Sequence, residues 1–420
     1  MSRWGRRLTE GLRGSALARF FHANRKLFVF LVIANFLLQF GHRIWQSTFN
    51  NFAVERLNIG PDMVGWIQSA REVPGLLVIG VALLALLFSE LRIIAVSLVL
   101  LGVGILLTGQ ATSLPLLLAA TMIMSFGFHF FGPASNGALM MSVDKRDAPR
   151  VLGWMRTIAA AAGVLGTLVI LLLVERIGYP ALFMTVGGVV IAGGLLLFRM
   201  GKNGHRLPER RKARFRAKYW VFYVLSFLAG SRRHILTTFA PFLLVKDFAV
   251  AVQIMSVLHL INSLVNTFAH QLIGQAISWI GERRILTLAS VVLIPVFLGY
   301  AFVDRLWILF VLFSVDNLLF ATNAALTTYI QKIAVTREEL TSNLAAQEAI
   351  GHIAAVVIPV TGGVLWALLG SKVPFLIGVA IAALSAVFAQ FVQTDGPEAD
   401  GTPEAEAGQS AYTSRRGGFG

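Results

Sequence analysis

Five arginines and three carboxylates lie in the interior of long stretches of this sequence that are otherwise apolar, more than one residue from either end. The arginines are Arg43, Arg71, Arg156, Arg232 and Arg233, and the carboxylates are Glu72, Asp316 and Glu348. A charged side chain at the centre of a lipid bilayer costs at least ~2.5 to 3.5 kcal/mol, so it normally faces a partner or a water-filled cavity. Even if each carboxylate paired with one arginine, two positive charges would remain.

Guanidinium groups bind carboxylate and phosphate oxygens bidentately, so these arginines could hold an anionic substrate. A polar stripe with helical spacing extends the predicted site along one helix face. The predicted substrate-binding residues are Arg43, Arg71, Arg232, Arg233, His259, Asn262 and Asn266. In the alternative interpretation, the arginines and carboxylates pair only to hold the helices together.

The three carboxylates are also candidates for proton coupling, because a carboxylate reached by water from alternate sides could bind and release a proton. His352 follows Glu348 by one helical turn and could form a relay with it. Each carboxylate could instead be a fixed counter-ion of an arginine. Other histidines, His129 and His234 among them, are expected to be packing residues.

The elements that position these groups are predicted to be membrane-spanning helices. The chain has 420 residues, of which 56% are hydrophobic and 14% are charged, and its mean hydropathy is +0.73. Apolar runs near the ~20 residues that cross a bilayer as a helix recur along it, and their continuity disfavours membrane strands. The sequence therefore predicts an all-α polytopic membrane protein with twelve transmembrane helices. The predicted spans are 27–54, 63–88, 91–110, 114–141, 151–174, 180–198, 219–245, 251–280, 285–303, 306–330, 340–369 and 373–391.

Basic residues are concentrated on one side of this topology. The net charge is +15, and a basic arm (1–26) and a basic linker (199–218) fall on the same side of the predicted membrane. The positive-inside rule makes that side cytoplasmic, so both termini, including the disordered tail predicted for 394–420, are expected there. This placement of charge favours a membrane protein, expected in a bacterial inner (plasma) membrane, over a nucleic-acid-binding one.

The chain contains an internal repeat. Aligning "RIWQSTFNNFAVER" (43–56) with "RHILTTFAPFLLVK" (233–246) places Arg43 opposite Arg233. Aligning "SNGALM" (135–140) with "TNAALT" (322–327) places His129 opposite Asp316. The residues 27–198 and 219–393 are therefore interpreted as two copies of one six-helix unit, with Arg43, Arg71, Glu72, Arg233 and Asp316 in one central layer.

Two parallel six-helix halves joined by a basic loop resemble the major facilitator superfamily. The segment "GQAISWIGERR" is similar to the family's loop motif, although Ser278 and Trp279 replace its acidic and basic pair. The resemblance implies a role in gating for the residues that match this motif. An arginine near the cytoplasmic end of the fifth predicted span is added to them. The predicted gating residues are Gly274, Gly281, Arg283, Arg284 and Arg156.

The sequence thus predicts a secondary active transporter that moves a small anionic or organic solute by alternating access, coupled to H+. The chain is expected to be a monomer embedded in membrane lipid, without cofactor or metal. It has no cysteine, no metal-ligand spacing and no G-x-x-x-x-G-K-[ST] motif for ATP. One alternative is an integral membrane enzyme acting on lipid through Glu348, His352 or Asp316. Another is a receptor or scaffold that keeps a transporter fold without moving solute.

Overall fold

A computed structural model describes residues 25–201, apart from 79–80, 82–83, 85–86 and 144–146, and residues 216–393. Nearly all of the predicted N-terminal arm, most of the basic linker and the whole of the predicted tail lie outside these residues.

The first part of the chain forms long helices at the predicted spans, but the helix of the second span ends at Leu76 and is followed by a turn, whereas the predicted span ran over 63–88. The helices are α3 (Arg25–Leu57), α4 (Pro61–Leu76), α6 (Glu90–Gln110), α7 (Leu114–Ser142) and α8 (Ala148–Met200). The helix α8 includes non-helical backbone at Gly178, whose φ is 73°. Because glycine adopts positive φ at little cost, α8 bends there and consists of two consecutive helices, as the predicted spans 151–174 and 180–198 require.

The second part of the chain also consists of long helices. Its helices are α9 (Trp220–Lys246), α10 (Val252–Ile280), α11 (Glu282–Phe302), α12 (Leu306–Phe320), α13 (Ala324–Ile333), α14 (Arg337–Leu369) and α15 (Lys372–Phe388). A 3-10 turn (Ala321–Asn323) lies within the span predicted over 306–330, which the structure keeps as one helical passage from Leu306 to Ile333. The Thr322 hydroxyl donates a hydrogen bond to the Leu319 carbonyl at 2.6 Å, a side-chain bond that competes with regular helix pairing.

Nine of the described helical stretches are long and apolar enough to cross a membrane. That number counts both parts of α8 once and omits α4 and α9. The described part of α4 has 16 residues, and α9 carries Arg232, Arg233 and His234 at its centre, which lowers its hydropathy. With these included, and with α12 and α13 taken as one passage, the described residues make twelve helical passages.

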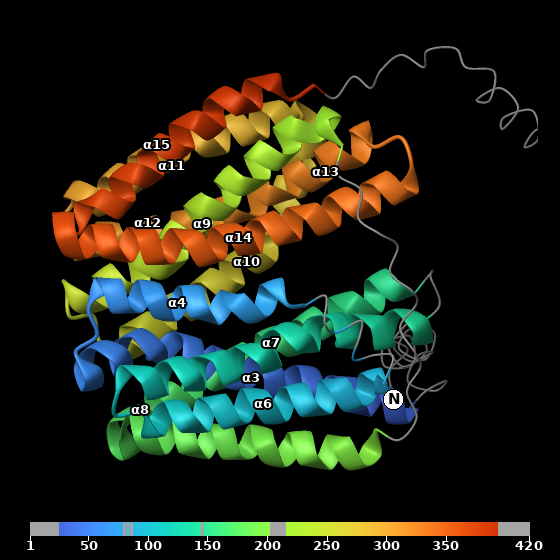
Figure 1. Cartoon of the computed structure of the whole chain (residues 1–420), viewed down its shortest axis with the longest axis vertical. Helices are drawn as coiled ribbons and strands as arrows, with labels where there is room; N and C mark the ends of the chain where they lie inside the picture. Colours follow the sequence, from blue (N-terminus) through green and yellow to red (C-terminus); the bar gives the residue numbers. More distant parts are fainter. Residues whose placement is uncertain are drawn as a thin grey trace, which may run out of the picture.

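The helices form two groups that lie one above the other in Figure 1. The first group contains α3 to α8, and the second contains α9 to α15. We call the end of the bundle where α9 begins the linker end, and the opposite end, where α3 leads into α4, the far end. The blue α4 lies directly along the orange α14, so these two helices join the groups (Figure 1).

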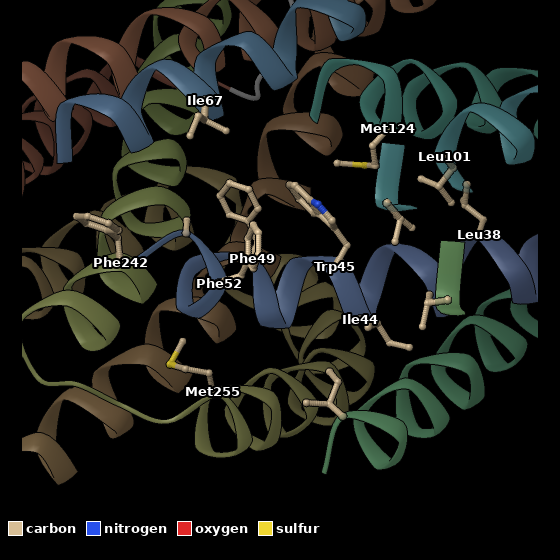
Figure 2. Packing of buried hydrophobic residues seen from close by; sticks show 14 of the residues in the cluster. Leu38, Ile44, Trp45, Phe49, Phe52, Ile67, Leu101, Met124, Phe242 and Met255 are labelled. Atoms are coloured by element: carbon tan, nitrogen blue, oxygen red, sulfur yellow. The ribbon is translucent and has the colours of Figure 1, made fainter. Parts of the chain in front are cut away.

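One hydrophobic cluster runs through both groups. Figure 2 shows Trp45, Phe49 and Phe52 projecting from α3, with Phe242 and Met255 of the second group in the same cluster. The rings of Trp45 and Phe49 lie 4.6 Å apart between centroids. A second cluster, which includes Tyr219, belongs to the linker end of the second group alone. The shared core therefore holds the groups together toward the far end.

Candidate functional site

The seam between α4 and α14 is made by residues without bulky side chains. A Cβ added at Gly65 would lie 2.3 Å from the Pro359 carbonyl oxygen, and one at Gly363 would lie 2.4 Å from the Pro61 carbonyl oxygen. Backbone atoms cannot yield as side chains do, so only glycine allows the helices to approach this closely. The seam closes the far end of the molecule and brings the polar middle of α4 against α14.

Three hydrogen bonds also join the groups at the far end. Asn51 Nδ2 donates to the Val250 carbonyl oxygen at 2.9 Å, and Gln253 Nε2 donates to Glu175 Oε1 at 2.5 Å. Lys246 Nζ lies 3.4 Å from Asn58 Oδ1. Together with the glycine seam, these bonds indicate a conformation that is closed at the far end.

A cluster around Glu72 spans the boundary between the groups. Arg71 Nη2 donates to Glu72 Oε1 at 2.8 Å. His129 Nε2 of α7 lies 3.7 Å from Glu72 Oε2, and His352 Nδ1 of α14 lies 3.4 Å from the same oxygen. Glu72 is only 8% exposed. One buried carboxylate is therefore shared by an arginine, a histidine of its own group and a histidine of the other group.

Gly75, one turn beyond Glu72, makes room for both imidazoles. A Cβ at Gly75 would lie 2.4 Å from the His352 ring and 3.1 Å from His129 Cε1. The two rings themselves are 5.2 Å apart between centroids. The absence of a side chain at Gly75 is thus a condition for His352 to reach across to Glu72.

Two expectations about this cluster change. We expected His352 to form a relay with Glu348, but its imidazole contacts Glu72 instead, because its side of α14 faces α4. Glu348 is exposed, and its charge acts on Arg233. His129 was expected to be a packing residue and instead faces Glu72. Its alignment opposite Asp316 in the repeat was the signal that could have identified it.

The neighbouring arginines of α9 have different environments. Arg232 is 6% exposed, and its Nη2 donates to Asn323 Oδ1 at 2.9 Å. The charge of Asp316 also acts on Arg232. Arg233 is exposed, and its guanidinium carbon lies 4.4 Å from the centre of the Phe320 ring. Asp316 therefore belongs with Arg232, whereas Arg233 belongs with the Glu72 cluster, whose charge acts on it.

Arg43 lies partly buried between α3 and α8. Its Nε is 3.6 Å from where a Cβ of Gly163 would stand, so glycine makes space for the guanidinium. Within the part of the chain that the structure describes, Arg43 has neither a hydrogen bond nor an ion pair, and its charge acts on His42 and on His259 of α10. An intramembrane cation without a counter-ion is suited to an anionic ligand.

The polar stripe of α10 packs against α12. The His259 ring stands edge-on to Phe313, with centroids 5.5 Å apart. Asn262 Nδ2 donates to the Phe313 carbonyl oxygen at 3.3 Å, and Asn266 donates to Asn317. Of the predicted stripe, His259 is the member on which the charge of Arg43 acts, while the two asparagines donate hydrogen bonds to α12.

The predicted gating residues lie toward the linker end. Gly281 has φ of 83° and connects α10 to α11, a backbone conformation that favours glycine. Arg283 donates two hydrogen bonds to Gln390 Oε1, at 3.0 and 3.3 Å, within the second group. Three others are exposed, namely Gly274, Arg284 and Arg156. Among the residues that the structure describes, no group of side chains could hold a metal ion.

Comparison with known proteins agrees with this architecture. A family model described as Major Facilitator Superfamily matches residues 31–338. The inward-facing, unoccupied crystal structure of a bacterial homolog of the human lysosomal transporter Spinster superimposes with a TM-score of 0.71 at 13% identity, covering 88% of this chain and 96% of that chain. The crystal structure of the nucleoside transporter NupG superimposes with a TM-score of 0.67 at 15% identity, covering 87% of this chain and 98% of that chain. At these identities the structural likeness shows the fold alone. No curated protein matches the sequence.

Proposed function

The chain belongs to the major facilitator superfamily, a family of membrane transporters rather than enzymes, and we propose that it moves a small organic anion by alternating access. In such proteins two helix groups rock around a site near the middle of the membrane. The choice of an anion rests on the surroundings of the Arg43 and Arg233 guanidinium groups.

Neither arginine donates a hydrogen bond to a carboxylate within the described residues. Arg71 is bonded to Glu72, and Arg232 is bonded to Asn323 beside Asp316. The charge of Arg43 acts on the imidazoles of His42 and His259, and the Arg233 guanidinium lies over the Phe320 ring. A carboxylate or phosphate ester would supply the missing acceptor oxygens, since guanidinium groups bind them bidentately.

We propose that Glu72 couples this movement to protons. Its carboxylate contacts one imidazole in each helix group, so adding a proton to it changes an attraction that holds the groups together. Asp316 beside Arg232 is the second candidate for coupling, and Glu348 near Arg233 is the third. The coupling proton would then be exchanged at a carboxylate whose contacts depend on whether the far end is closed.

We also propose that the chain acts as a monomer in a bacterial inner membrane, with both termini in the cytoplasm. The basic linker supports this orientation through the positive-inside rule. Reporter fusions at each terminus check it, and a periplasmic signal at either terminus would reject the orientation.

Uptake into proteoliposomes tests the proposed function. Labelled monocarboxylates, dicarboxylates and sugar phosphates are compared with nucleosides and neutral sugars, under an imposed pH gradient and without one. We expect saturable uptake of an anion that the pH gradient accelerates. Uptake restricted to uncharged solutes, or anion uptake that survives in Arg233→Ala, would reject the anion site.

A further inference from the structure

Arg232 and Arg233 are consecutive in α9, so their side chains leave the helix about 100° apart. Arg232 turns into the second group and is 6% exposed, whereas Arg233 is exposed. The repeat aligns Arg233 with Arg43, but the sequence does not tell what either side chain of the pair contacts. The partners of the two side chains supply that reason.

Both partners come from the break between α12 and α13. Phe320 is the last residue of α12, and Asn323 is the last residue of the 3-10 turn that follows. In a 3-10 helix the residues i and i+3 eclipse one another, so Phe320 and Asn323 face the same side. Asn323 Oδ1 accepts from Arg232 at 2.9 Å, and the Phe320 ring lies 4.4 Å from the Arg233 guanidinium carbon.

We infer that Phe320 is a positioning residue for Arg233 and that the 3-10 turn gives the two arginines separate roles. This inference rests on the proposed function and names a further residue of the same site. Asn323 takes hydrogen-bond donors of Arg232, which makes Arg232 structural. Phe320 takes none from Arg233, because an aromatic ring attracts a cation through its face.

The stacking has a chemical consequence for the ligand. The Arg233 guanidinium lies over the face of the Phe320 ring, which accepts no hydrogen bond from it, so its N–H groups can still bind the two oxygens of a carboxylate or phosphate. The ring also restricts the rotamers of a long side chain, so less conformational freedom is lost when the anion binds. Phe320 therefore acts on substrate affinity through Arg233 without touching the substrate.

A structural role for Phe320 as apolar packing makes a different prediction. Leucine fills similar space without a π face, so a role in packing alone would tolerate Phe320→Leu. Phe320→Tyr keeps the aromatic ring and should be tolerated under both roles. The comparison of Phe320→Leu with Phe320→Tyr therefore separates positioning from packing. Phe320→Met provides a second ring-free variant if Phe320→Leu fails to fold.

The first measurement needs no substrate. In protein labelled with 15N-arginine, the Nε–H signal of Arg233 is assigned by its loss in Arg233→Lys. We expect an upfield ring-current shift in the wild type and in Phe320→Tyr, and its disappearance in Phe320→Leu. An unchanged Arg233 signal in Phe320→Leu would overturn the inference.

The second measurement is uptake kinetics with the anion found in the transport screen. We expect Phe320→Leu to raise KM about 3- to 30-fold with little change in kcat, and Phe320→Tyr to restore KM. A KM equal to that of the wild type in Phe320→Leu, with Arg233→Ala inactive, overturns the inference but leaves the anion site in place. Full uptake in Arg233→Ala rejects the proposed function, whatever the ring-current result.

Discussion

His352 of α14 lies 3.4 Å from Glu72 of α4 and so links the two helix groups through a buried carboxylate. The link depends on Gly75, over which the imidazole packs, and it lies on the same pair of helices as the glycine seam. Opening the far end would separate α4 from α14 and break this contact. The proposed coupling therefore predicts that protonation of Glu72 and opening of the far end affect one another.

Glu72→Gln should uncouple transport from the proton gradient. The amide keeps the shape of the side chain but cannot gain or lose a proton, so accumulation driven by a pH gradient should fall about 5- to 150-fold. Counterflow, which needs no net proton movement, should be largely kept. Uptake in proteoliposomes under both regimes measures the difference.

Asp316→Asn is the matched comparison for Glu72→Gln. We expect gradient-driven accumulation to survive better in Asp316→Asn, because Asp316 lies beside Arg232 and does not bridge the groups. If only Asp316→Asn loses accumulation, the coupling site lies there and not at Glu72.

Arg232→Ala and Arg233→Ala should have opposite effects on stability and transport. Arg232→Ala leaves the partly buried Asn323 without its donor and should lower the free energy of unfolding by about 1 to 3 kcal/mol. Arg233→Ala removes an exposed side chain and should cost less than about 1 kcal/mol while abolishing anion uptake. Thermal unfolding in detergent and uptake assays check the two effects, and equal destabilisation by both variants would contradict this assignment.

Gly363→Ala should weaken closure of the far end. Its Cβ would lie 2.4 Å from the Pro61 carbonyl oxygen, and such overpacking costs about 1 to 3 kcal/mol. Gly351→Ala on the same helix meets nothing within 4 Å and serves as the control. The readout is thermal stability together with labelling of a cysteine placed in the seam. Equal behaviour of the two variants would mean that the seam is not tightly packed.

Cross-linking at the far end should arrest transport. The chain has no cysteine, so Glu175→Cys with Gln253→Cys introduces one reactive pair at a contact between the groups. We expect a short bismaleimide to join the pair and to stop uptake, while either single variant with reagent stays active. Full uptake by the cross-linked protein would show that the groups need not part at this end.

Most of the fold could be predicted from the sequence, because the physical signal is local. Runs of apolar residues near the bilayer thickness predicted the spans, and most of the observed helices follow them, including the break at Gly178 between two spans. The exception is α4, which ends at Leu76, well before the predicted end at 88. The 3-10 turn after Phe320 was missed, since Thr322 and Asn323 are polar without being strong helix breakers. At the turn the Thr322 hydroxyl donates to the Leu319 carbonyl, a side-chain hydrogen bond that no periodicity reveals.

Composition and spacing alone determined that this chain is an all-helical membrane protein and that its apolar spans contain more arginines than carboxylates, and they indicated an internal repeat. Only the tertiary structure decided which charges meet. Arg232 and Arg233 are neighbours in sequence yet belong to different environments, and His352 serves Glu72, which is far away in the chain, and not Glu348 one turn away. The reason is that helix periodicity fixes which side a residue faces, whereas its partner depends on which helix packs against that side.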